Sequence, residues 1–122
     1  MQSIWVGMLP GPKSTRVIAM RGTSETILRA RLCSSPSSPF AIQMLLEAIA
    51  LWEGCRVRAA LVVDDDPDSS RRDLYRAAYR LSGTTSLYDL DLVSDSRRHD
   101  PAGRAIDSFR ELEQLVLFEL AR

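Results

Sequence analysis

The stretch VRAALVVDDDPDSS, Val57 to Ser70, decides the fold. Its first seven residues are apolar except for one arginine, and they include the β-branched residues typical of strands. A short run of this kind predicts a central strand, Arg56–Val63, that is covered on both faces of a sheet. The run ends in Asp64, Asp65 and Asp66. Carboxylates therefore follow the carboxyl end of a central strand, which is where open α/β sheets place their ligands.

Three shorter segments before this strand also have strand character. They are Ser3–Leu9, Thr15–Arg21 and Glu25–Leu32, separated by Pro-Gly-Pro at residues 10–12 and by Gly22. The third segment alternates with a period of two, which is typical of a half-buried strand. Short strands joined by tight turns predict an antiparallel meander.

Two helices are indicated around the central strand. The first covers Phe40–Glu53, with Ser37 or Ser38 as N-cap, Pro39 at its first position and Gly54 as C-cap. It is apolar nearly all round, so we expect it to be mostly buried against the sheet. The second starts after Ser70, which forms a capping box with Asp73, and it closes at Gly83.

The remaining elements are a strand at Ser86–Val93, nearer an edge of the sheet, and a final helix over residues 107–122. The predicted order is β-β-β-α-β-α-β-α in a single α/β domain, residues 1–122. We expect a five-stranded mixed sheet flanked by three helices. The connection from the fourth strand to the fifth should be a parallel crossover.

Composition excludes few functions. The 122 residues include 16 basic and 16 acidic side chains, so no global field marks nucleic acid or membrane as a partner. Cys33 and Cys55 show no metal-binding spacing and are interpreted as reduced packing residues. The start MQSIWVGMLPG lacks the basic region and the long apolar run of a signal peptide, and the longest apolar stretch, Ala41–Trp52, is too short to span a bilayer. We therefore expect no membrane partner and a cytoplasmic location.

The element order is that of the ribonuclease H-like fold, and local features of the chain resemble this superfamily. A Gly/Pro turn, PGPK, follows the first strand, and IALWEGCRV, Ile49–Val57, leads from the first helix into the fourth strand. Asp64 ends that strand, His99 lies in a loop before the last helix, and Asp107 lies where that helix begins. The resemblance implies that Asp64 and Asp107 are metal ligands and that His99 is a catalytic histidine.

The chain also departs from the family pattern. The family's first strand carries a metal-binding carboxylate, where this chain has Val6 or Gly7, and Gln43 stands where the first helix carries a glutamate. Glu47, one turn later, could substitute only if the helix were shifted. Two-metal phosphodiester hydrolysis needs several carboxylates converging on two ions about 4 Å apart. We therefore expect a degenerate, non-catalytic ribonuclease H-like domain that acts in binding or assembly.

Each candidate residue has a plainer interpretation, which we favour. Asp64 can serve solubility near a helix N-terminus, Asp107 can cap the last helix, and His99 can be an ordinary loop residue. Trp5 and Trp52 are interpreted as packing residues rather than stacking platforms, because the sequence does not alternate aromatic and basic residues around them.

Arg72, Arg76 and Arg80 share one helix face at spacings of four. This face is either a phosphate-binding stripe, with nucleic acid as partner, or a solvated surface, which is the interpretation we favour.

Two alternative functions stay open. One is a divergent nuclease that uses Mg²⁺ or Mn²⁺ held by Asp64, Asp107 and Glu47 and acts on RNA–DNA hybrid or structured nucleic acid. The other is a homo-oligomeric interaction protein without nucleic-acid contact, assembled through the apolar C-terminal helix. No other cofactor is indicated.

Overall fold

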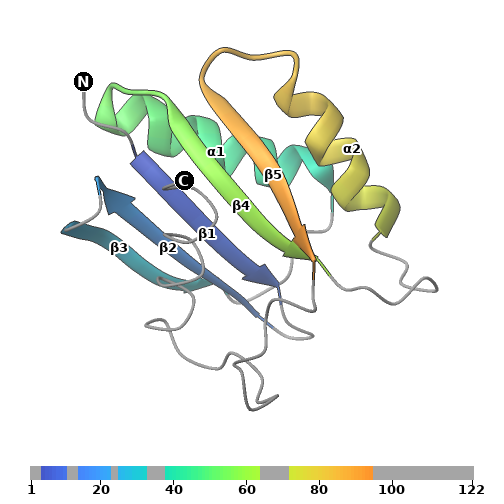
Figure 1. Ribbon diagram of the computed structural model, residues 1–122, viewed down its shortest axis with the longest axis horizontal. Helices are drawn as coiled ribbons and strands as arrows, with labels where there is room; N and C mark the ends of the chain where they lie inside the picture. Colours follow the sequence, from blue (N-terminus) through green and yellow to red (C-terminus); the bar gives the residue numbers. More distant parts are fainter. Residues whose placement is uncertain (1–3, 11–13, 23–24, 33–37, 64–71, 95–122) are drawn as a thin grey trace.

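The computed structural model describes residues 4–10, 14–22, 25–32, 38–63 and 72–94, which form one sheet and two helices (Figure 1). The elements are β1 Ile4–Pro10, β2 Thr15–Arg21, β3 Glu25–Leu32, α1 Pro39–Glu53, β4 Val57–Val63, α2 Arg72–Ser82 and β5 Tyr88–Ser94. These bounds agree with the predicted ones to within two residues. The predicted helix at 107–122 lies outside the described residues.

The five strands are ordered β3-β2-β1-β4-β5. β1 pairs with β2, and β2 with β3, in antiparallel register, whereas β4 lies parallel to both β1 and β5. The predicted meander, the parallel crossover through α2 and the edge position of β5 are therefore confirmed. Both helices start at the end of the sheet where β1, β4 and β5 finish (Figure 1).

The buried side chains lie in two groups on opposite faces of the sheet, because successive strand residues alternate. One group lies beneath the helices, where Ile42, Leu46 and Ala50 of α1 and Tyr75 and Ala78 of α2 pack on the strands. The other face also carries buried side chains: Leu9, Ile18, Met20, Ala60, Val62 and Val93. β4 contributes to both groups, which confirms that it is a central strand covered on both faces.

Local signals set the two ends of α1. Ser38 is the N-cap, and its hydroxyl accepts a hydrogen bond from the Ala41 backbone N–H at 3.3 Å. Pro39 follows at the first helical position, where its missing N–H costs nothing. Gly54 ends the helix at φ 68°, in the left-handed region that favours glycine. The capping residues therefore position a 15-residue helix across the sheet.

Candidate interaction surface

The outward face of α1 is apolar and exposed. Phe40 is 58% exposed, Met44 70%, Leu51 69% and Trp52 88%. Ala41 and Ala48 are also exposed and lie among them on the same side of the helix. We call these six residues the α1 stripe; none of them is charged or polar.

The prediction that α1 is mostly buried is wrong. Only Ile42, Leu46 and Ala50 are fully buried, since a helix lying on a sheet turns one face toward it. The interpretation of Trp52 as a packing residue is wrong too, because its side chain is the most exposed of the large apolar ones described. Trp5 is half-buried and packs on the sheet face opposite the helices, as predicted.

A groove beside α1 continues the stripe toward the edge of the sheet. It has a volume of about 310 Å³ and lies between α1 and β3. Ala48, Ile49 and Trp52 line it from the helix, and Ile27 and Leu28 line it from the strand. Leu28 is itself 38% exposed. The apolar surface therefore extends from the helix onto the edge strand.

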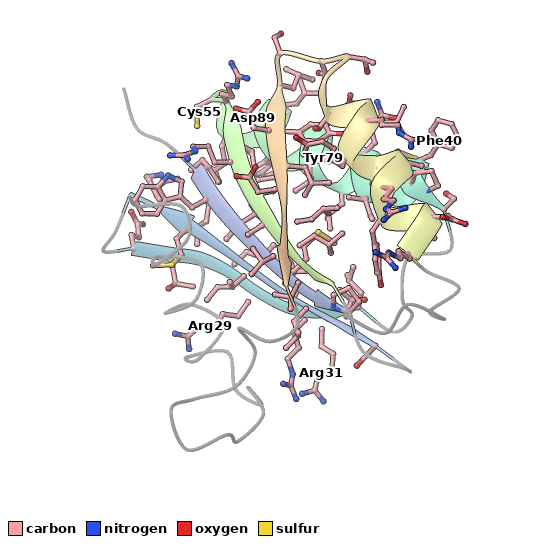
Figure 2. All side chains as sticks on the ribbon, turned by 45° about the vertical axis from the view of Figure 1, so that its right-hand side comes forward. Arg29, Arg31, Phe40, Cys55, Tyr79 and Asp89 are labelled. Carbon is pink, nitrogen blue, oxygen red and sulfur yellow. The ribbon has the colours of Figure 1, made fainter. Side chains whose placement is uncertain are left out.

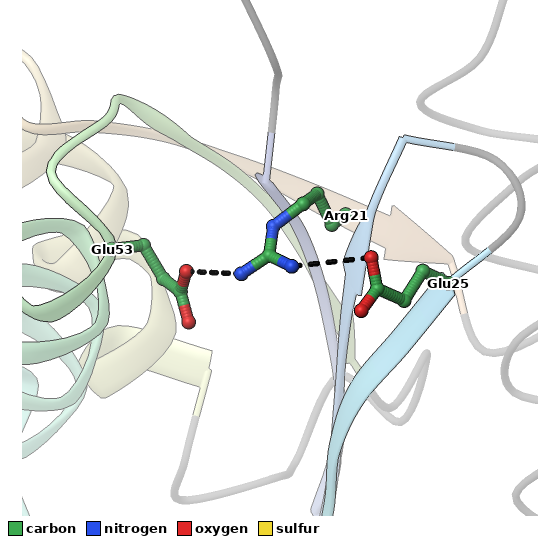
Figure 3. A network of polar contacts seen from close by, with 3 residues as sticks. All are labelled: Arg21, Glu25 and Glu53. Carbon is green, nitrogen blue, oxygen red and sulfur yellow. Dashed lines mark hydrogen bonds and ion pairs between the residues drawn. The ribbon is translucent and has the colours of Figure 1, made fainter.

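A three-residue ion network holds the carboxyl end of α1 against the sheet (Figure 3). Arg21, at the end of β2, donates to Glu53 of α1 at 2.7 Å and to Glu25 of β3 at 3.1 Å. The hydrogen bond to Glu53, followed by the charge of Glu25, raises the pKa of the Arg21 guanidinium above its usual value. Arg21 thus remains charged and links three elements beside Trp52, the end residue of the α1 stripe.

Asp64, Asp107 and His99, the candidates for metal binding and catalysis, lie outside the described residues. Glu47 is described: it is half-buried on α1 and accepts a hydrogen bond from the Gln43 side-chain amide at 3.4 Å. Its negative charge raises the pKa of Tyr88, although burial of that phenol is the larger cause.

The position expected for a first-strand carboxylate is apolar and enclosed. Val6, Gly7 and Met8 are all buried in β1. Val6 and Met8 pack beneath the helices, next to Ala59 and Leu61 of the parallel strand β4. Among the described residues no group of three or more His, Cys, Asp or Glu side chains could hold a metal ion. This part of the chain does not fit the oxygen-rich shell that Mg²⁺ requires.

The three arginines predicted to share a helix face are all exposed on α2. Tyr79 is 52% exposed (Figure 2), and at three positions after Arg76 and seven after Arg72 it borders the arginine face. The sequence interpretation considered only the two tryptophans and missed this tyrosine. Helical spacing places Tyr79 next to both Arg76, three positions before it, and the buried Tyr75, four positions before it, so spacing alone did not predict its exposure.

A polar cavity of about 480 Å³ lies next to this surface, at the outer edge of β5. Arg58, Tyr79, Arg80, Asp89 and Asp91 are among its lining residues. Asp89 also pairs with an exposed arginine, Arg56, at 2.6 Å. Charges of both signs therefore line this edge, and charged side chains on an edge strand discourage pairing with the strands of other molecules.

No family model matches the chain, and no curated protein matches it either. Within the described residues, no helix is long and apolar enough to cross a membrane. We therefore infer function from the surfaces of the described residues.

Proposed function

We propose that this chain is a degenerate, non-catalytic ribonuclease H-like domain that acts in binding or assembly through the α1 stripe. The order of its seven described elements, β-β-β-α-β-α-β, supports the family assignment. The observation that carries the function is the exposure of four large apolar side chains side by side on one helix.

The four large side chains of the α1 stripe are all more than half exposed. A helix on the surface of a soluble domain ordinarily turns charged or polar residues outward. Here the outward face has only apolar residues, although α2, on the same face of the sheet, has arginines on its exposed side. Contiguous exposed apolar surface, especially with aromatic residues and methionine, is typical of protein-binding sites.

Loss of catalysis is supported by the side chains present on β1 and α1. A two-metal site needs oxygen ligands from neighbouring elements, but Val6, Gly7 and Met8 supply none, and Gln43 supplies a neutral amide.

A cleavage assay tests the loss of catalysis. The purified chain is incubated with labelled RNA–DNA hybrid and either Mg²⁺ or Mn²⁺, beside an Asp64→Asn variant. We expect no cleavage above background from either protein. Cleavage by the unaltered chain that Asp64→Asn abolishes contradicts the proposal and favours the divergent nuclease.

A second candidate function, contact with nucleic acid, is favoured by Tyr79. An exposed aromatic ring among arginines can stack on a base while the guanidinium groups bind neighbouring phosphates. This surface is separate from the α1 stripe, because Tyr79 and Arg80 line the cavity at the outer edge of β5. Binding there requires no metal and is compatible with a non-catalytic domain.

A further inference from the structure

We infer that the partner of the α1 stripe is a second copy of this chain, with the two α1 helices packed antiparallel across a two-fold axis at the level of Leu46. This inference rests on the proposed binding role of the stripe. It goes beyond that role by naming the partner and the register of the contact.

The stripe is symmetric about the middle of the helix. Its six residues form three pairs, each centred on position 46: Phe40 with Trp52, Ala41 with Leu51, and Met44 with Ala48. A two-fold axis across antiparallel helices brings the members of each pair to the same level on opposite copies.

The sizes of these side chains fit such a contact. At each end, Phe40 and Ala41 of one copy reach the level of the partner's Leu51 and the partner's Trp52. In the middle, Met44 lies beside the partner's Ala48. The two alanines on each helix leave room that the large side chains of the other copy fill, which is the requirement for close helix packing.

The exposed area is sufficient for a dimer of modest affinity. With 150–250 Å² for each aromatic residue, the exposed fractions of Phe40, Met44, Leu51 and Trp52 amount to roughly 600 Å². Two copies together bury about 1,200 Å², the lower end of the range for stable interfaces. We expect a dissociation constant of roughly 1–100 µM, because an interface of this small area leaves little net binding free energy after the entropic cost of association.

Charge does not oppose the pairing. The stripe is uncharged, and Glu53 at its edge is paired with Arg21. Arg80 of α2 lines the cavity beside β5, the edge strand of the sheet, and is not part of the α1 stripe.

Sedimentation velocity from about 1 to 200 µM tests the dimer, with folding of every variant checked by circular dichroism. We expect a monomer–dimer equilibrium that Met44→Glu or Ala48→Lys alone weakens at least tenfold. Ser86→Glu, at an exposed position before β5 and outside the α1 stripe, is the control and should leave the monomer–dimer equilibrium unchanged.

The double variant Met44→Glu/Ala48→Lys tests the register. In the antiparallel pairing each introduced acid lies beside the introduced base of the other copy, so dimerisation should return to within a few-fold of the original. Failure of the double variant to recover overturns the antiparallel pairing. A chain that stays monomeric at every concentration overturns the second copy as partner.

An independent signal comes from Trp52. In a Trp5→Phe background its emission should shift to shorter wavelength over the same concentrations, because dimerisation removes an exposed indole from water. If the chain is monomeric and does not cleave hybrid, only the inference of a second copy as partner is wrong. If the chain dimerises and cleaves hybrid, only the proposed loss of catalysis is wrong.

Discussion

Arg21 and Glu53 join the end of β2 to the last turn of α1 through a 2.7 Å hydrogen-bonded ion pair. The Glu53 side chain is 17% exposed, whereas the other partner of Arg21, Glu25, is 58% exposed. Water screens the second pair more strongly, so the two carboxylates should contribute unequally to stability.

The first prediction compares Glu53→Gln with Glu25→Gln. Glu53→Gln should lower the urea midpoint clearly, because it leaves Arg21 with one exposed partner. Glu25→Gln should change the midpoint little. Equilibrium urea unfolding by circular dichroism measures the midpoints of both variants. Equal shifts of the two midpoints would show that the burial of Glu53 does not strengthen its ion pair with Arg21.

The second prediction concerns Tyr88, which is fully buried at the start of β5. Within the described residues its hydroxyl has no hydrogen-bond partner. A buried unsatisfied polar group costs about 1–3 kcal/mol. Tyr88→Phe should therefore raise the free energy of unfolding by about 1 kcal/mol, an unusual gain for a core substitution. A loss of stability in urea unfolding would show that the hydroxyl does have a partner.

Tyr88 should also make stability fall at alkaline pH. Burial, with the charge of Glu47 second, raises the pKa of the phenol above its usual value of 10.0. Above pH 10 the unfolded chain loses this proton while the folded chain keeps it, so the free energy of unfolding decreases as pH rises. The slope is at most about 1.4 kcal/mol per pH unit. Urea unfolding at pH 8 and at pH 11 should show a smaller loss for Tyr88→Phe than for the unaltered chain.

The third prediction uses two leucines on the same helix. Leu46 is fully buried, and Leu51 is 69% exposed. Leu46→Ala should lower the free energy of unfolding by about 3 kcal/mol, because it removes buried apolar contacts and leaves a cavity. Leu51→Ala should change it by less than about 0.5 kcal/mol at concentrations where the chain is monomeric. Comparable losses would contradict the exposure of the α1 stripe.

These two leucines also show where sequence reasoning ends. Periodicity, the serine–proline start and Gly54 located α1 almost to the residue, and strand patterns did the same for β2 and β3. These are local signals. Which side of an apolar helix lacks a covering element depends on the sheet and on α2, which are distant in the sequence. The pattern of α1 could therefore predict the helix but not its exposed face.

Tyr79 was missed for a related reason. On α2, Tyr75 and Tyr79 lie one turn apart, but only Tyr75 is buried. The exposure of Tyr79 depends on which side of α2 faces the sheet. The element order, by contrast, follows from local patterns alone, so it was predicted more completely than either surface.

The fourth prediction tests the cap of α1. Gly54 adopts φ 68°, and an added Cβ would meet no atom within 4 Å. The cost of Gly54→Ala is therefore conformational, and the variant should lose about 1 kcal/mol of stability. Gly54→Asn should lose less, because asparagine tolerates the left-handed region better. Urea unfolding of the two variants should reproduce this order, and the reverse order would contradict the left-handed cap.

The fifth prediction concerns α2 and nucleic acid. Fluorescence anisotropy with a labelled single strand and a labelled RNA–DNA hybrid, at 50 and 200 mM salt, measures affinity and its salt dependence. If Arg76 and Arg80 bind phosphates, Arg76→Gln/Arg80→Gln should weaken binding and reduce the slope of log K against log salt by about 0.7 per lost contact on the single strand. Tyr79→Ala should weaken single-strand binding by about 1–3 kcal/mol with little change in slope, because stacking releases no counterions.

The control for these variants lies on β3. Arg29 and Arg31 are exposed there, on an edge of the sheet remote from α2 (Figure 2). Arg29→Gln/Arg31→Gln removes the same net charge as the α2 double variant but leaves Tyr79 and its neighbouring arginines intact. Equal losses from the two double variants would indicate binding driven by net charge alone. A loss confined to the α2 variants would make that helix a nucleic-acid surface, separate from the protein-binding role that we propose for the α1 stripe.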